Sequence, residues 1–255
     1  MSVAYPRVRA VLFDLDGTLV DSAPDLVGCV QDIMRERGAR PLPFKSLRQF
    51  ISKGMRGLLT AAYGADFVDS EEYPDVLERC LELYSGRLAE RSRLFPGMRG
   101  VLDSLARRRI PWGVVTNKPE YLTRPLLEAL DLADECAVAV GGGTTTHTKP
   151  HPEPMIFAAD RLAVKPRACL MLGDDPRDMQ AARRAGMTGL AAAWGYFPPG
   201  EDLSTWGAAA VLQSPPDLLE WLKEMEPGAE ASPTPPELQC SESAGSIPHP
   251  RYSSP

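Results

Sequence analysis

Four short polar motifs, in a fixed order along 255 residues, constrain what this chain can fold into. Three of them end a hydrophobic run that has the composition of a buried strand, and these motifs begin at Asp14, Thr116 and Gly173. The fourth, Lys149-Pro150, lies in a loop between the last two. Continuously apolar strands are typical of parallel sheets, which bind ligands at the carboxyl ends of their strands. We therefore expect these polar residues to meet at one edge of a sheet.

The pattern of the whole chain favours an α/β fold. Residues 8–13 are short, apolar and rich in β-branched side chains, and from Phe95 onward predicted helices and strands alternate. Later strands are predicted at 111–115, 136–140, 168–172, 188–193 and 209–212. Helices are predicted at 97–108, 119–130, 153–163, 176–186 and 217–225. Such alternation predicts a doubly wound parallel sheet with helices on both faces.

Two segments depart from this alternation. Residues 22–91 carry helical periodicity and are predicted to form a small helical insert. Residues 227–255 are rich in proline and serine and poor in apolar side chains, which predicts a disordered tail. The predicted core therefore consists of residues 1–21 and 92–226.

The composition restricts the partners of the chain. A net charge of −6 gives no support for binding to nucleic acids or membranes, so an anionic substrate needs local positive charge or a metal. The five cysteines form no C-x-x-C pair, and no signal peptide or membrane helix is recognisable, so a reducing cytoplasm is the expected location. Three histidines, one of them in the predicted tail, argue against phosphatase chemistry based on histidine.

The first motif contains two carboxylates. Asp14 lies where the first predicted strand ends, and Asp16 follows in a turn that Gly17 makes flexible. One carboxylate can attack phosphorus while the other donates a proton to the leaving oxygen and later accepts one. A D-x-D pair alone is more often a solvated turn, so the downstream motifs give the catalytic interpretation its weight.

The two middle motifs can bind a phosphate group. Thr116 and Asn117 offer a hydroxyl and backbone N–H groups, although a turn or a cap for the next helix is the alternative. Lys149 lies in a loop that Pro150 stiffens. A lysine there can offset the repulsion between an attacking carboxylate and the phosphate, although a loop lysine is usually only solvated.

The last motif contains Asp174, Asp175 and Asp178. Three acids this close repel one another unless a cation lies among them, and magnesium prefers carboxylates, water and phosphate. This favours one magnesium ion shared by Asp14 and Asp174. Acidic capping of the helix at 176–186 is the alternative, and both can hold if Asp175 caps the helix while Asp174 binds metal.

These motifs, in this order, resemble those of the haloacid dehalogenase superfamily over about residues 8–225: DxDGT, a strand-terminal TN, KP and GDDxxD. The insert after the first motif is similar to the C1-type cap that this superfamily adds to its Rossmann-like core. The stretches LFDLDGTLVDSAPD, GVVTNKP, KPHPEP and GDDPRDMQAARRAGM are similar to phosphoglycolate-phosphatase-like members. The stretch WGYFPPGEDLSTWGAAAV further resembles the N-acetylmuramic acid 6-phosphate phosphatase branch, which works in cytoplasmic peptidoglycan recycling.

The resemblance implies roles for the residues that react with or hold the phosphoryl group. Asp14 would be the nucleophile that becomes an aspartyl phosphate. Asp16 would be the general acid and base, and its backbone carbonyl would also bind magnesium. Thr116 and Asn117 would hold the phosphoryl oxygens, and Lys149 would stabilise both the nucleophile and the phosphate.

The resemblance also implies roles around these residues. Asp174 would complete the protein ligands of magnesium, and Asp178 would orient Lys149 or a metal-bound water. Asp175 stands where a small or hydroxyl residue is commoner, which leaves its role open. Arg56 lies where such caps reach toward the substrate and could bind a carboxylate, although an exposed helix charge is as plausible an interpretation.

Together these features predict a magnesium-dependent phosphomonoesterase that acts on a small carboxylate-bearing phosphate ester, either N-acetylmuramic acid 6-phosphate or 2-phosphoglycolate. One alternative is a sugar phosphomutase on the same scaffold, which would return the phosphoryl group to the substrate. A non-enzymatic phospho-receiver module is a weaker alternative. Receivers carry the phosphorylated aspartate on a later strand and lack the helical insert.

Overall fold

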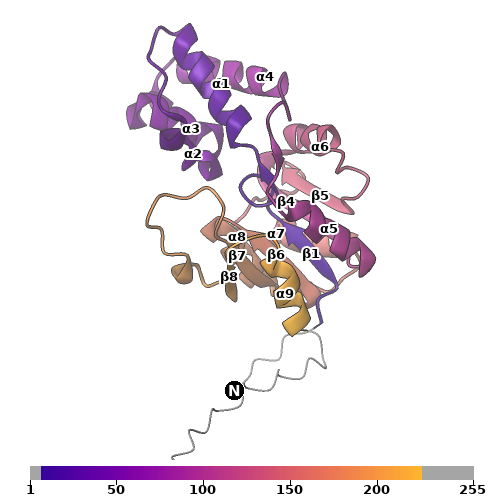
Figure 1. Cartoon of the computed structure of the whole chain (residues 1–255). Helices are drawn as coiled ribbons and strands as arrows, with labels where there is room; N and C mark the ends of the chain where they lie inside the picture. The colour runs from indigo at the N-terminus through magenta and orange to yellow at the C-terminus, as the bar shows by residue number, and fades with distance from the viewer. Residues whose placement is uncertain (1–6, 226–255) are drawn as a thin grey trace, which may run out of the picture.

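A computed structural model describes residues 7–225, and the tail predicted at 227–255 lies outside the described residues. Six strands form one parallel sheet in the order β5-β4-β1-β6-β7-β8 (Figure 1). These strands are β1 (Ala10–Phe13), β4 (Trp112–Pro119), β5 (Val138–Gly142), β6 (Cys169–Gly173), β7 (Thr188–Ala192) and β8 (Ala210–Leu212). The predicted doubly wound sheet is therefore confirmed, with β1 and its following motif near the centre.

Alternate residues of β1 face two helical layers. Val11 and Phe13 pack against one layer, and Ala10 and Leu12 pack against the other. The first layer contains α5 (Met98–Arg107), α6 (Glu120–Ala129) and α9 (Asp217–Glu224), and the second contains α7 (Glu153–Arg161) and α8 (Pro176–Ala185). Short 3-10 helices precede β6 and β8 at η3 (Pro166–Ala168) and η4 (Leu203–Trp206).

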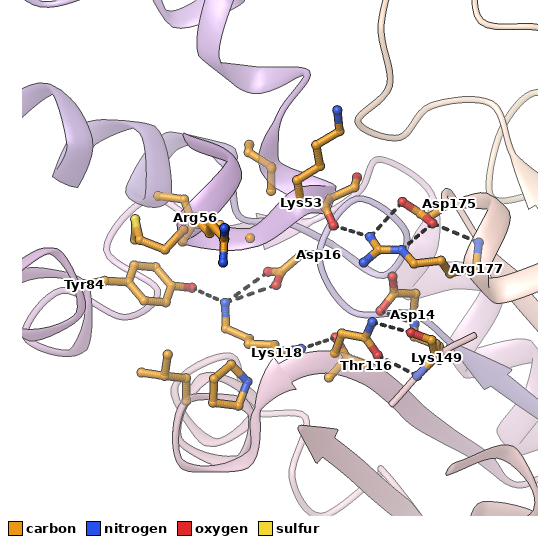
Figure 2. A pocket seen from close by; sticks show the side chains of 18 of the residues that line it. Asp14, Asp16, Lys53, Arg56, Tyr84, Thr116, Lys118, Lys149, Asp175 and Arg177 are labelled. Carbon is orange, nitrogen blue, oxygen red and sulfur yellow. Dashed lines mark hydrogen bonds and ion pairs between the residues drawn. The ribbon is translucent and has the colours of Figure 1, made fainter. Parts of the chain in front are cut away.

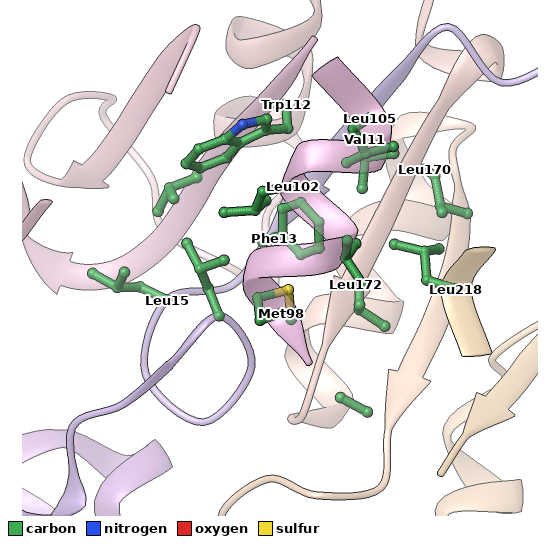
Figure 3. Packing of buried hydrophobic residues seen from close by; sticks show 14 of the residues in the cluster. Val11, Phe13, Leu15, Met98, Leu102, Leu105, Trp112, Leu170, Leu172 and Leu218 are labelled. Atoms are coloured by element: carbon green, nitrogen blue, oxygen red, sulfur yellow. The ribbon is translucent and has the colours of Figure 1, made fainter. Parts of the chain in front are cut away.

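The layer around Phe13 forms a densely packed core (Figure 3). Phe13 meets Trp112 of the neighbouring strand edge to face, with ring centroids 6.1 Å apart. Full burial of one such side chain contributes about 1.5–3 kcal/mol, so this packing fixes the position at which β1 ends. The motif that begins at Asp14 thereby follows a fully buried strand of the sheet.

The observed strand boundaries differ from the prediction mainly in β4 and β5. β4 continues to Pro119, and its pairing with β5 becomes irregular after Val115. Thr116 and Asn117 consequently lie within the irregular end of the strand rather than beyond it. β5 begins two residues later than predicted. Helix α6 runs unbroken from Glu120 to Ala129, although it contains Pro125.

The helical insert, drawn at the top of Figure 1, lies between β2 (Val20–Asp21) and β3 (Arg93–Leu94). These two short strands pair antiparallel. Its helices are α1 (Ala23–Glu36), α2 (Phe44–Arg48), α3 (Gly54–Tyr63) and α4 (Tyr73–Ser85), with 3-10 turns η1 (Ile51–Lys53) and η2 (Ala65–Asp69). They enclose a second hydrophobic cluster, which also includes Phe95, Leu122 and Tyr196 of the core. The insert therefore packs around its own helices and against the core, and β2 and β3 link it to the rest of the chain.

The cysteines of the described region are free thiols, namely Cys29, Cys80, Cys136 and Cys169. Burial raises the pKa of Cys80 to about 12, so it packs as a neutral side chain within the insert. No helix within residues 7–225 has the length and hydrophobicity that crossing a membrane requires.

Candidate active site

A cavity of about 370 Å³ lies between the helical insert and the carboxyl ends of the central strands (Figure 2). The core contributes polar side chains to it, including Asp14, Asp16, Thr116, Lys118, Lys149 and Asp178. The insert contributes Ser52, Lys53, Arg56 and Tyr84, together with apolar side chains such as Leu26, Met55, Leu77 and Leu81. The predicted gathering of polar residues at one sheet edge is therefore observed.

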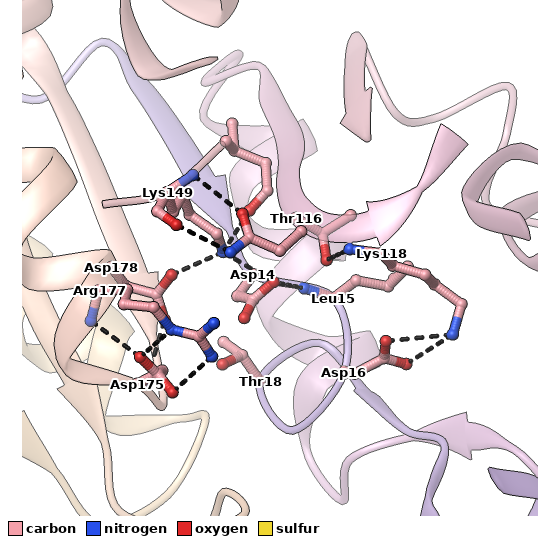
Figure 4. Close-up of polar contacts among 12 residues, drawn as sticks. Asp14, Leu15, Asp16, Thr18, Thr116, Lys118, Lys149, Asp175, Arg177 and Asp178 are labelled. Carbon is pink, nitrogen blue, oxygen red and sulfur yellow. Dashed lines mark hydrogen bonds and ion pairs between the residues drawn. The ribbon is translucent and has the colours of Figure 1, made fainter. Parts of the chain in front are cut away.

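Lys149 is buried beside Asp14 (Figure 4). Its Nζ lies 2.9 Å from Asp14 Oδ1 and 2.6 Å from Asp178 Oδ1, and it donates a 2.8 Å hydrogen bond to the Val115 carbonyl. Burial disfavours the ammonium, but the charges of Asp14 and Asp178 outweigh that effect and raise the pKa of Lys149. A positive charge is thus fixed against the Asp14 carboxylate.

Asp174 is buried close to Asp14, with 1% of its surface exposed. Its carboxylate accepts hydrogen bonds from the Tyr196 N–H at 2.8 Å and from the Thr18 hydroxyl at 2.9 Å. Gly17 has a φ of +90°, and a Cβ there would lie 2.2 Å from Asp174 Oδ2. Glycine is therefore required for the first motif to approach Asp174 so closely.

Asp14, Asp174 and Asp178 each place a carboxylate oxygen within 4.8 Å of the others. Burial, followed by the charge of Asp14, raises the pKa of Asp174 well above its usual value. Burial also raises the pKa of Asp178 to about 7, although Lys149 opposes that shift. A divalent cation would offset this repulsion, and a set of oxygen donors suits magnesium. The residues present therefore fit the expected ion.

Asp16 lies apart from these three acids and is paired with Lys118 (Figure 4). The Lys118 Nζ lies 3.1 Å and 3.3 Å from the two Asp16 oxygens, and the Ser22 hydroxyl donates to Asp16 at 2.5 Å. The same Nζ donates to the Tyr84 hydroxyl of the insert at 2.8 Å. Because these bonds engage the Asp16 carboxylate, the backbone carbonyl of Asp16 is the group available for the predicted metal contact.

Thr116 and Asn117 differ in what they present to the cavity. Thr116 is buried at its wall, and its hydroxyl accepts the Lys118 N–H at 3.2 Å. The Asn117 amide instead bonds both the N–H and the carbonyl of Lys149, at 2.9 Å each. The Asn117 side chain thus supports the Lys149 loop, and only its main chain is left for the predicted contact with phosphoryl oxygens.

Asp175 caps helix α8, as the capping alternative predicted. It accepts the Arg177 N–H at 2.9 Å, and Asp178 completes a capping box. The Arg177 guanidinium also bonds both Asp175 oxygens, at 2.7 Å and 2.8 Å, and donates to the Ser52 carbonyl of the insert. Burial opposes ionisation, but Arg177 outweighs it and lowers the pKa of Asp175. Asp175 therefore orients an arginine that contacts the insert.

Sequence reasoning gave no role to several residues of the site, among them Thr18, Tyr84, Lys118 and Arg177. Thr18, Lys118 and Arg177 lie within or directly beside the motifs quoted above. Their place next to predicted site residues could have marked them as site residues too. Tyr84 had no such signal, because it occupies one of several apolar positions on its helix. Arg56 lines the cavity from α3, as its predicted position near the substrate requires.

Comparison with known proteins gives the family. The family model for haloacid dehalogenase-like hydrolases matches residues 11–192. The chain is 42% identical over 212 residues to a phosphoglycolate phosphatase of Xanthomonas campestris pv. campestris, covering 83% of this chain and 95% of that protein. It is 35% identical over 216 residues to an N-acetylmuramic acid 6-phosphate phosphatase of Pseudomonas aeruginosa, covering 85% and 95%.

A solved structure shares the fold. The crystal structure of a predicted phosphoglycolate phosphatase from Haemophilus somnus superposes with a TM-score of 0.75 at 25% identity, covering 85% of this chain and 98% of that one. The chain belongs to the haloacid dehalogenase-like hydrolase family. Within that family it is a phosphoric monoester hydrolase.

Proposed function

We propose that the chain is a magnesium-dependent phosphomonoesterase that hydrolyses a small carboxylate-bearing phosphate ester through phosphorylated Asp14. One observation carries the proposal. The Asp14 carboxylate lies at the end of the central strand, 2.9 Å from a buried ammonium and within 4.8 Å of two further acids. A nucleophile, a cation that stabilises negative charge and a set of metal ligands thus converge on one point.

The covalent steps use the two aspartates in the roles that the family resemblance implies. An oxygen of Asp14 attacks phosphorus, the bond from phosphorus to the ester oxygen breaks, and Asp16 donates a proton to that oxygen. Asp16 then accepts a proton from the water that attacks phosphorus. The bond from phosphorus to Asp14 breaks and inorganic phosphate leaves. Lys149 stabilises the negative charge near Asp14 throughout, while Thr116 and the main chain of Asn117 bind the phosphoryl oxygens.

The carboxylates of Asp14 and Asp174 and the backbone carbonyl of Asp16 would hold the magnesium ion. When bound, the ion supplies positive charge that draws the phosphoryl group toward Asp14. Thr18 and the Tyr196 N–H keep the Asp174 carboxylate in place for this purpose. Hydrogen bonds of this kind orient a metal ligand before the metal arrives.

The choice of substrate rests on the relatives and on the cavity. The relatives described above act on phosphoglycolate or on N-acetylmuramic acid 6-phosphate, according to their names, and both esters carry a carboxylate. The higher identity favours phosphoglycolate. A cavity of about 370 Å³ with apolar side chains from the insert has room for a sugar ring, which favours the muramic ester. We propose the muramic ester first and 2-phosphoglycolate second.

The location of the protein belongs to the same proposal. We infer a cytoplasmic location, where the free thiols of the described residues would persist and where either ester would be a metabolite.

The test is a hydrolysis screen against a panel of phosphate monoesters, with product analysis. The account expects inorganic phosphate and the free alcohol, full loss of turnover with EDTA, and recovery with magnesium but poor recovery with calcium. Full turnover after exhaustive chelation would refute the requirement for magnesium. An isomeric phosphate ester in place of inorganic phosphate would indicate a phosphomutase.

A further inference from the structure

The cavity carries positive charge at two separate places. Lys149 lies with Asp14 and Asp178 at the nucleophile. Lys118 and Arg56 line the part of the cavity beside Tyr84, and Figure 2 shows both side chains pointing into it. The second place has no task in the covalent steps, although a buried lysine is costly to maintain.

Lys118 is almost completely buried, with 5% of its side chain exposed. An ammonium has three N–H donors, and the contacts of Lys118 are the two Asp16 oxygens and the Tyr84 hydroxyl. Its Nζ also lies 4.4 Å from the centre of the Tyr84 ring. Asp16 is therefore the one negative charge in hydrogen-bonding contact with this ammonium among the described residues.

Asp16 has a second task that conflicts with this pairing. To protonate the ester oxygen, Asp16 has to take up a proton from solvent and turn toward the phosphoryl group at Asp14. Lys118 then keeps only the neutral Tyr84 hydroxyl. An ammonium that loses its carboxylate partner while it stays buried is strongly destabilised. Some other anion has to replace Asp16 for the reaction to proceed without that cost.

Arg56 lies at the same part of the cavity and is available to such an anion. It is exposed on helix α3, and within residues 7–225 its guanidinium forms no ion pair or hydrogen bond. A guanidinium binds carboxylates in a planar, two-point arrangement. A carboxylate between Lys118 and Arg56 would therefore contact one compact cation and one planar cation.

We propose that Lys118 and Arg56 bind the carboxylate of the substrate, which replaces Asp16 on Lys118 when Asp16 turns to the ester oxygen. This inference rests on the proposed function and adds the residues that recognise the substrate carboxylate. An ester without a carboxylate leaves Lys118 unpaired in the transition state. The enzyme thus selects carboxylate-bearing esters by a penalty on all others.

Two matched pairs of esters test this. Ethyl phosphate has the carbon skeleton length of 2-phosphoglycolate without the carboxylate, and N-acetylglucosamine 6-phosphate lacks the lactyl acid of the muramic ester. We expect Lys118→Met to lower kcat/KM for the carboxylate-bearing member of the faster pair, relative to its carboxylate-free partner, at least about tenfold, because the variant removes both the contact with the carboxylate and the penalty on its absence. Lys45→Met, an exposed lysine of α2, is the control and should leave the ratio unchanged.

A second variant guards against loss of folding in Lys118→Met. Tyr84→Phe keeps the Lys118–Asp16 pair and removes the hydroxyl that Lys118 retains when Asp16 turns, so the carboxylate-free ester should lose more and the same ratio should rise. Equal losses on both members of a pair, in both variants, would overturn the inference, because Lys118 would then act only by holding Asp16. If wild type with magnesium hydrolyses no ester at all, the proposed function fails instead.

Discussion

The two buried lysines of the cavity differ in what holds them. Lys149 contacts Asp14, Asp178 and the Val115 carbonyl, and all three belong to the core. Lys118 contacts Asp16 from the core and Tyr84 from the helical insert. The contacts of the lysine beside the nucleophile thus all lie within the core, whereas the contacts of the lysine beside the acid include the insert.

This difference separates two tasks. A cation fixed by the core serves every phosphate ester equally, because each places the same phosphoryl group on Asp14. A cation shared with the insert can respond to the rest of the substrate. Variants at the first place should therefore lower all rates together, and variants at the second place should change the preference among esters.

The largest effect is expected at Lys149. Lys149→Met removes the charge that stabilises Asp14 and the phosphoryl group, so kcat/KM should fall by at least about 10³-fold. The loss should be similar for p-nitrophenyl phosphate and for alkyl esters, measured beside the melting temperature to confirm folding. A loss confined to carboxylate-bearing esters would erase the distinction between the two lysines.

A smaller and selective effect is expected at Arg56. Arg56→Ala removes the proposed charge-assisted hydrogen bond to the substrate carboxylate. The transition state for a carboxylate-bearing ester should therefore lose about 1–3 kcal/mol of stabilisation, measured as a lower kcat/KM. Turnover of p-nitrophenyl phosphate should change much less. Equal losses on both esters would mean that Arg56 supports the insert and does not read the substrate.

The smallest effect is expected at Asp175. Asparagine is also a good N-cap, so Asp175→Asn should leave the melting temperature nearly unchanged while it weakens the hold on Arg177. The contact of Arg177 with the Ser52 carbonyl should loosen, and the lower kcat/KM should correspond to a loss of about 1 kcal/mol of transition-state stabilisation. Asp202→Asn alters another side-chain cap, at η4, and is the matched control. An unchanged kcat/KM would assign Asp175 to helix capping alone.

The core of the site could be predicted because its residues share one local signal. Asp14, Thr116 and Asp174 lie at or near the ends of apolar strands, and parallel strands bring those ends together without any knowledge of packing. Lys149 and Asp178 follow from the resemblance, and the structure brings both to Asp14. For Asn117 the motif placed the residue, but not the direction in which its amide points.

The contact between Lys118 and Tyr84 could not be predicted in this way. The two residues are 34 positions apart, and helical periodicity marks Tyr84 only as a buried position of α4. The direction of its hydroxyl depends on how the insert packs over the sheet, which no local pattern encodes. The hydrogen bond from Arg177 to the Ser52 carbonyl depends on the same packing and could not be predicted either.

The central claim is that Asp14 carries the phosphoryl group between substrate and water. Borohydride reduction of enzyme quenched during turnover converts an aspartyl phosphate to homoserine, and peptide mass spectrometry then locates the modified residue. The account predicts homoserine at position 14 in the wild type, none without magnesium, and none in Asp14→Asn, whose turnover should be at least about a hundredfold lower. Modification at another residue, or near-normal turnover by Asp14→Asn, would contradict the mechanism.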